Sequence, residues 1–97
     1  MDINPDPTPI ASGDPKSAVA IQEWIIAWLA RELPMPAEDI DPDQTFEFYG
    51  ASSLSVVVMT GELADRLKIE VDPASVYDYP TIGGFSAYVA SISEAAP

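Results

Sequence analysis

The sequence predicts an all-α fold: a four-helix bundle with a long loop between its first and second helices and a short third helix. Three observations lead to this prediction. Apolar residues recur at three- and four-residue spacing in three separate stretches, which is the period of an amphipathic helix. Capping residues and prolines mark where the helices begin. A polar stretch interrupted by prolines separates the first two helices.

The composition excludes several classes of function. The chain has 97 residues, enough for one small domain, and its net charge is -12, with 4 Lys+Arg against 16 Asp+Glu. Such a chain repels nucleic acid and suits basic partner surfaces. It has no cysteine and no histidine, which removes disulfides, thiol nucleophiles and the commonest general base. No run approaches the ~20 apolar residues of a membrane span, so we expect a monomeric, cytoplasmic domain that does not enter membranes.

The chain divides into three parts. Residues 1–13 are rich in proline and aspartate and are expected to form a flexible leader or linker. Residues 14–93 are expected to form the folded domain, and residues 94–97 a disordered tail.

The first helix is predicted to begin after Asp14, with Asp14 as N-cap and Pro15 in the first helical position, and to end near Leu33 because Pro34 follows. Its apolar stripe consists of Ile21, Trp24, Ile25, Trp28 and Leu29. The two tryptophans share that stripe, so we interpret them as core residues and not as a ligand box.

Residues 34–51 form the long loop, which Ile40, Phe46 and Tyr49 are expected to anchor to the core. The acids in its "DIDPD" segment resemble the start of a calcium-binding loop. The match fails because such a loop needs glycine at position 6 and glutamate at position 12, where this chain has Gln44 and Gly50. A solvated acidic loop is the better interpretation.

Two further helices are predicted near the C-terminus. Asp72 and Pro73 should start the short third helix over residues 73–77, and Thr81 should cap the last one. Gly83 and Gly84 weaken the first turn of that last helix by roughly 1 kcal/mol each relative to alanine. The residues expected to share its buried face are Ile82, Phe85, Val89 and Ile92.

The second helix, predicted over residues 53–68, has apolar residues on two opposite sides. One side is a complete core stripe made of Val56, Met59, Leu63 and Leu67. The other side carries Leu54, Val57, Val58, Gly61 and Asp65. If the first side faces the core, the second is exposed, and an exposed apolar patch indicates a docking surface. The alternative is a helix that is buried on both sides.

Two serines stand at the start of this helix. Ser52 suits the N-cap position. A catalytic serine needs a base, and this chain has no histidine; "GASSL" also lacks the second glycine of the G-x-S-x-G motif. A helix N-terminus favours a negative group, so a serine there suits a phosphate-linked modification made by another enzyme.

The stretch "FEFYGASSLSVVVMTGELADRLKIEVDPASVYDYPTIGGFSAYV" resembles the carrier proteins of fatty acid and polyketide synthesis. The resemblance covers residues 17–92. The family pattern around its modified serine is glycine, two residues, serine and leucine, which Gly50, Ser53 and Leu54 match here. The family's terminal signature matches "YDYPTIGGFSAYV", with Phe85, Ser86 and Val89 as substitutions.

The resemblance implies that Ser53 carries a covalent 4'-phosphopantetheine arm derived from coenzyme A and attached by a phosphopantetheinyl transferase, which would make the chain a phosphoprotein. The thiol of the arm would hold an acyl chain as a thioester. The resemblance also implies that the Leu54, Val57, Val58, Gly61 and Asp65 side of the second helix meets synthase enzymes such as a ketosynthase, an acyltransferase or an acyl-AMP ligase. The chain would not be a catalyst by itself.

The sequence departs from the family pattern at Ser52, where an aspartate is usual, and at Ser55 and Val58, where acids are common. The docking side is therefore more apolar, which resembles a polyketide-synthase carrier or one loaded by an acyl-AMP ligase. These departures leave the preferred transferase open and keep Ser52 as an alternative attachment site.

Three other hypotheses remain. A peptidyl carrier of nonribosomal synthesis is one, although histidine or aspartate commonly precedes its serine. The second is an unmodified acidic helical adaptor, in which Ser52 is only a cap and Ser53 only a residue of the first turn. A hydrolase is the most distant.

Overall fold

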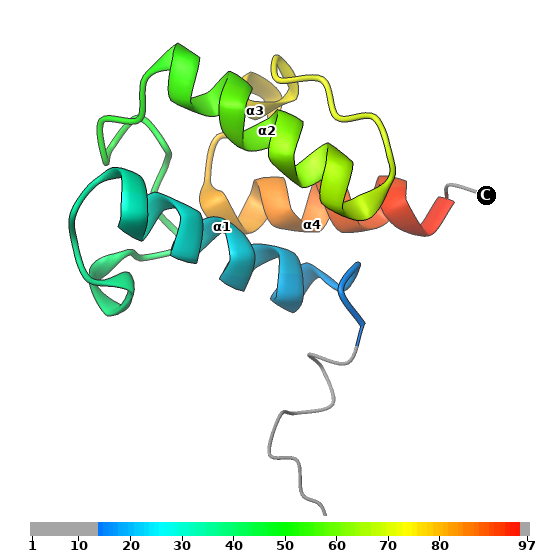
Figure 1. Ribbon diagram of the computed structural model, residues 1–97, viewed down its shortest axis with the longest axis horizontal. Helices are drawn as coiled ribbons and strands as arrows, with labels where there is room; N and C mark the ends of the chain where they lie inside the picture. The colour runs from blue at the N-terminus through cyan, green and yellow to red at the C-terminus, as the bar shows by residue number, and fades with distance from the viewer. Residues whose placement is uncertain (1–13, 96–97) are drawn as a thin grey trace, which may run out of the picture.

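The computed structural model describes residues 14–95 and shows four α-helices and one short 3-10 helix. The helices are α1 (Ala18–Glu32), η2 (Ala37–Asp39), α2 (Ser53–Leu67), α3 (Ser75–Asp78) and α4 (Ile82–Ala95). α4 lies alongside α1, and α2 runs across them with α3 near its first half (Figure 1). Over the described residues the only β pairing is an isolated bridge, so the predicted all-α fold is confirmed. The predicted leader, residues 1–13, lies outside the described residues.

One apolar core holds the helices together. Each of the long helices contributes an apolar stripe, and the loop adds two residues. The buried hydrophobic residues are Ile21, Ile25, Trp28, Leu29, Ile40, Phe46, Met59, Leu63, Leu67, Val76, Ile82, Phe85 and Val89. No helix within residues 14–95 combines the length and apolarity needed to cross a bilayer.

α1 begins three residues later than Asp14 suggested. Ser17 is the N-cap, and its hydroxyl accepts a hydrogen bond from the amide of Ala20 at 3.1 Å. The Asp14 carboxylate instead accepts the amide of Lys16 at 2.9 Å in a turn before the helix. The predicted cap was therefore wrong, because a second capping residue stood closer to the apolar stripe. Trp28 is buried as expected, and Trp24 packs against the core.

The long loop is fixed at several points, which explains how the 20 residues between α1 and α2 stay ordered. Ile40 and Phe46 are buried as predicted. The Tyr49 hydroxyl accepts the amide of Asp41 at 2.6 Å, so Tyr49 joins two parts of the loop. Two backbone hydrogen bonds join the loop to the start of α4 and the residues just before it. The Phe46 amide donates to the Pro80 carbonyl, and the Gly83 amide donates to the Pro42 carbonyl.

Gly83, at the start of α4, allows that close approach of the loop. A Cβ at Gly83 would lie 3.3 Å from the backbone oxygen of Pro42, and a Cβ at Gly84 would lie 2.7 Å from the Thr81 side chain. The Thr81 hydroxyl accepts the amide of Gly84 at 3.0 Å, as the predicted cap should. The helical propensity lost at Gly83 is thus accompanied by tight contact with the loop, and that lost at Gly84 by tight contact with the capping side chain of Thr81.

α4 differs from its prediction at the C-terminal end. Its buried stripe continues through Val89 to Ser93, while Ile92 is half-buried. The helix continues to Ala95, so Glu94 and Ala95 do not belong to a disordered tail; both residue types favour helix and neither breaks it. Residues 96–97 lie outside the described residues.

Candidate functional site

Ser52 is the N-cap of α2, as the sequence predicted. Its backbone is extended, and its hydroxyl oxygen accepts the amide of Ser55 at 3.1 Å. The Ser52 hydroxyl also donates to the Ser55 hydroxyl at 3.2 Å. Gly50 lies just before, with φ of +79°, a conformation that glycine adopts most easily. This turn brings the chain from the loop into the helix and sets the positions of both serines.

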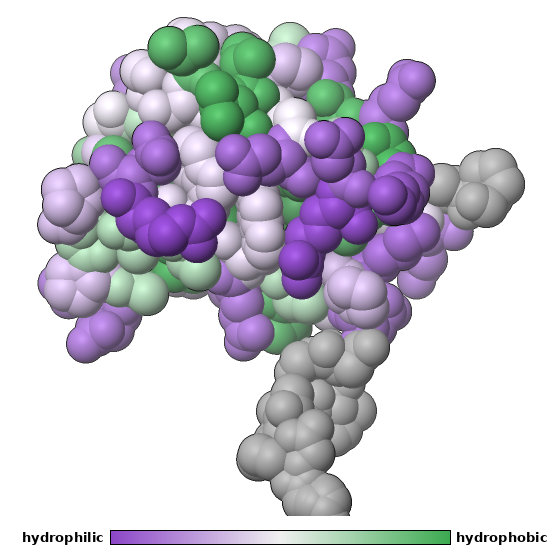
Figure 2. Space-filling view, viewed as in Figure 1, coloured by the Kyte–Doolittle hydropathy of each residue, from purple (hydrophilic) through white to green (hydrophobic). Residues whose placement is uncertain are grey.

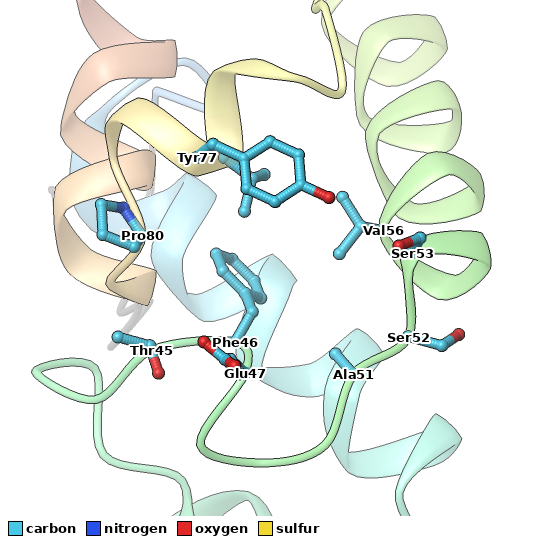
Figure 3. A pocket seen from close by; sticks show the side chains of 10 residues that line it. Thr45, Phe46, Glu47, Ala51, Ser52, Ser53, Val56, Tyr77 and Pro80 are labelled. Atoms are coloured by element: carbon cyan, nitrogen blue, oxygen red, sulfur yellow. The ribbon is translucent and has the colours of Figure 1, made fainter.

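Ser53 is the first residue of α2 and is exposed to solvent. In Figure 3 its hydroxyl points into a pocket, whereas the Ser52 side chain points away from that pocket. Within residues 14–95 the Ser53 hydroxyl makes no hydrogen bond. Ser53 therefore offers an accessible oxygen at the positive end of a helix of 15 residues, where a phosphate-linked group is electrostatically favoured.

The pocket beside Ser53 has a volume of about 390 Å³ and lies between α2, α3 and the loop (Figure 3). Its lining residues are Thr45, Phe46, Glu47, Ala51, Ser52, Ser53, Val56, Val76, Tyr77 and Pro80. Phe46 and Val76 are core residues, so the pocket is a shallow extension of the core toward the surface. A small organic group attached at Ser53 would have an apolar wall beside it.

The pocket beside Ser53 has few ionisable groups among its lining residues. No lysine or arginine lines the pocket, and the whole chain has no histidine. The one ionisable carboxylate at the pocket belongs to Glu47, which is exposed.

The outer side of α2 carries the exposed apolar residues that its sequence placed there. The exposed fractions are 73% for Leu54, 49% for Val57 and 43% for Val58; Gly61 and Asp65 are also exposed. Figure 2 shows hydrophobic surface over the first half of α2. On the inner side Met59, Leu63 and Leu67 are buried and Val56 is half-buried, so α2 is not buried on both sides.

Three residues of this region were not identified from the sequence. Tyr77 is exposed over 77% of its surface and forms one wall of the pocket, and Phe48 is exposed over 65%. Glu47 supplies the pocket's only charge. Their positions depend on how the loop and α3 pack against α2. The only available signal was the aromatic content of "FEFYG" and "VYDYP".

Comparison with known proteins gives a consistent result. The family model described as "Phosphopantetheine attachment site" matches residues 23–89. A phenolphthiocerol/phthiocerol polyketide synthase from Mycobacterium tuberculosis is 32% identical over 71 residues, which cover 73% of this chain and 4% of that protein. The chain therefore corresponds to a small part of that synthase.

Two solved structures have the same fold. A free-standing peptidyl carrier protein from Acinetobacter baumannii is 35% identical with a TM-score of 0.74, covering 79% of this chain and 96% of that chain. An acyl carrier protein from Anabaena, which has a variant phosphopantetheinylation-site sequence, is 29% identical with a TM-score of 0.75, covering 82% and 91%. The chain belongs to the phosphopantetheine attachment-site family, and it is a carrier domain of the kind to which that prosthetic group is covalently attached.

Proposed function

We propose that this domain carries acyl intermediates of polyketide or related fatty acyl synthesis as thioesters on a 4'-phosphopantetheine arm attached to Ser53. The observation that carries the proposal is the setting of Ser53, whose exposed hydroxyl points into a pocket at the start of a helix with an exposed apolar side. The arm, when bound, supplies a thiol, which the chain itself lacks because it has no cysteine.

The two serines have separate roles in this proposal. Ser52 holds the first turn of α2 through its bond with the Ser55 amide, and its side chain points away from the pocket. Ser53 is left to form the phosphodiester: its oxygen attacks the phosphorus that joins the arm to the nucleotide of coenzyme A, the phosphoanhydride bond breaks and the adenosine bisphosphate leaves. The transferase supplies the base that removes the hydroxyl proton. The positive end of the helix favours the phosphate that results.

The outer side of α2 is the proposed docking surface for the transferase and for synthase enzymes such as a ketosynthase, an acyltransferase or an acyl-AMP ligase. Leu54, Val57 and Val58 would contact a partner directly, and Gly61 leaves room because, apart from its chain neighbours and the backbone of its own helix, no atom lies within 4 Å of its Cβ position. The exposed Asp65 would meet basic groups at the rim. In this role the domain presents acyl groups and catalyses no step by itself.

A peptidyl carrier is the second candidate function, favoured by the likeness to the carrier protein from Acinetobacter baumannii. The two functions differ in the partners that they require. Adenylation and condensation enzymes encoded beside this chain would favour peptide synthesis, whereas a ketosynthase would favour polyketide synthesis.

Intact mass measured after incubation with coenzyme A and a broad-specificity phosphopantetheinyl transferase tests the attachment. We expect the wild-type chain and Ser52→Ala to gain one phosphopantetheine group, and Ser53→Ala to gain none. If Ser52→Ala is the only variant that gains no phosphopantetheine group, the attachment site is Ser52. No gain in any of the three, with circular dichroism showing each one folded and a second transferase tried, would support the unmodified adaptor.

A further inference from the structure

Two adjacent hydroxyls at the start of α2 could receive the arm. Ser52 and Ser53 are both exposed to solvent, so access alone does not select one of them. A third hydroxyl, that of Ser55, stands three residues after Ser52 and is half-buried. The three serines differ in their hydrogen bonds, and this difference determines which oxygen is free to react.

The hydroxyl of Ser52 is bonded to Ser55 both as acceptor and as donor. Its oxygen accepts a hydrogen bond from the Ser55 amide at 3.1 Å, and it donates its proton to the Ser55 hydroxyl oxygen at 3.2 Å. A serine hydroxyl has one proton to donate, so the second bond uses the only proton of Ser52. A general base must come within hydrogen-bond reach of the proton that it removes. A base of the transferase would therefore have to displace Ser55 from Ser52.

The hydroxyl of Ser53 is free of such bonds. Within residues 14–95 it neither donates nor accepts a hydrogen bond, and it points into the pocket while Ser52 points away (Figure 3). Helix geometry explains why Ser55 restrains only one of the two serines. Residues two positions apart in an α-helix are separated by about 200° around its axis, so Ser55 faces away from Ser53. Residues three positions apart are neighbours on one side, so Ser55 meets Ser52.

The cap bond alone would not restrain Ser52 in the same way. A hydroxyl that only accepts a bond from an amide still has its own proton free to donate. The side chain of Ser55 is what binds that proton. The backbone amide of residue 55 stays present whatever its side chain is, so substitution at this position separates the two bonds of Ser52 experimentally.

We propose that Ser55 directs the arm to Ser53 by holding the hydroxyl of Ser52. This inference rests on the proposed function. In the transfer, the serine oxygen attacks the phosphorus that joins the arm to the nucleotide of coenzyme A, the phosphoanhydride bond breaks, adenosine bisphosphate leaves, and the hydroxyl proton passes to a base of the transferase. Ser53 can give up its proton in this step, whereas that of Ser52 is held. Ser55 is a positioning residue, because it acts through Ser52.

The test removes Ser53 and measures whether Ser52 receives the arm in its place. Ser53→Ala is combined with Ser55→Val or with Ser55→Thr, two side chains of similar shape of which only threonine has a hydroxyl. Each double variant is incubated with coenzyme A and a broad-specificity phosphopantetheinyl transferase. Intact mass gives the rate of the gain, and fragment masses locate the arm. We expect Ser52 to gain the arm about tenfold faster with valine at position 55 than with threonine, which restores the lost hydrogen bond.

The matched control is Ser91→Ala combined with Ser53→Ala. Ser91 is an exposed serine of α4 whose hydroxyl donates to the Tyr88 carbonyl at 2.8 Å, so this variant also loses a bonded hydroxyl, but away from α2. It should leave Ser52 as unmodified as Ser53→Ala alone does. Circular dichroism shows whether each variant is folded.

A second measurement leaves Ser53 in place and does not depend on the transferase. The couplings between the Hα and Hβ protons of Ser52 report its side-chain rotamer. We expect one rotamer in the wild type and in Ser55→Thr, and averaging between rotamers in Ser55→Ala, where the acceptor of the Ser52 proton is missing.

Two results would overturn the inference. Equal rates at Ser52 with valine and with threonine at position 55, including no gain in either, would show that the Ser55 hydroxyl does not decide between the serines. A Ser52 rotamer that stays fixed in Ser55→Ala would show that Ser55 does not hold it. Failure of the wild-type chain to gain the arm at Ser53 would instead contradict the proposed function, so the two failures are distinguishable.

Discussion

The two sides of α2 carry similar side chains in opposite surroundings. Met59 and Leu63 on the inner side are exposed over 1% and 0% of their surface, whereas Leu54 and Val57 on the outer side are exposed over 73% and 49%. Burial explains the inner residues as part of the core. Nothing within residues 14–95 covers the outer ones, and an exposed apolar patch of this kind supports the proposed docking surface. Apolar character alone therefore does not assign a residue of α2 to the core.

The largest expected effect is on the inner side. Leu63→Ala should lower the free energy of unfolding by about 2–5 kcal/mol, because the substitution leaves a cavity in a closely packed core. Val57→Ala on the outer side should change it by less than ~0.5 kcal/mol. Urea unfolding followed by circular dichroism measures both. Similar losses in the two variants would remove the distinction between the sides.

The next largest effect is expected at the N-terminal cap of α2. Ser52→Ala should cost about 0.5–2 kcal/mol, because the amide of Ser55 loses its hydrogen-bond acceptor. Ser52→Asp retains a capping oxygen and should stay close to the wild type, as measured by urea unfolding followed by circular dichroism. A stability of Ser52→Ala equal to that of the wild type would show that the cap contributes nothing.

A smaller effect is expected in the second half of α2. The indole nitrogen of Trp28 donates a hydrogen bond to the Glu62 carboxylate at 3.1 Å, which joins α1 to α2. Glu62→Ala should cost about 1 kcal/mol, and Glu62→Gln should cost less because the amide oxygen can still accept. Denaturation followed by tryptophan fluorescence measures the difference, with Asp65→Asn as a neutral control. A loss in Asp65→Asn as large as in Glu62→Ala would attribute the effect to charge and not to this bond.

The smallest effect is that of salt on docking. The first half of α2 has no charged residue, and its acids, Glu62 and Asp65, lie in the second half. Raising salt from low to physiological concentration should therefore raise the KM of the transferase for this domain by only about threefold. Transferase kinetics at several salt concentrations check this. A far steeper rise would show that charges, and not the apolar residues, dominate docking.

Local signals predicted most of the helical fold. The caps Ser52 and Thr81 and the apolar stripes depend on residues within one or two turns of each other, so they can be found in one sequence. The predicted start of α1 was wrong because Asp14 and Ser17 are both good N-cap residues, and the choice between them depends on packing. The predicted tail began too early, at residue 94, because the last turn of α4, which ends at Ala95, contains no strong helix breaker.

The site was only partly predictable for a different reason. The exposed side of α2 follows from helix geometry alone, so Leu54, Val57 and Val58 could be placed from their spacing. The pocket depends on segments that are distant in sequence, such as Glu47 on the loop and Tyr77 on α3. The bond between Trp28 and Glu62 joins residues 34 positions apart. A single sequence contains no periodic signal for contacts of this kind.

The proposed docking role of the outer side of α2 is tested most directly with the variant Leu54→Gln. Transferase kcat/KM and the free energy of unfolding are measured on the same sample. Leucine and glutamine have similar helix propensities, and Leu54 is exposed over 73% of its surface. If the outer side of α2 is a docking surface, kcat/KM should fall about tenfold, as for a contact residue, while the free energy of unfolding should change by less than ~0.5 kcal/mol. An unchanged kcat/KM together with a large loss of stability would contradict it, because the outer side of α2 would then serve the fold and not a partner.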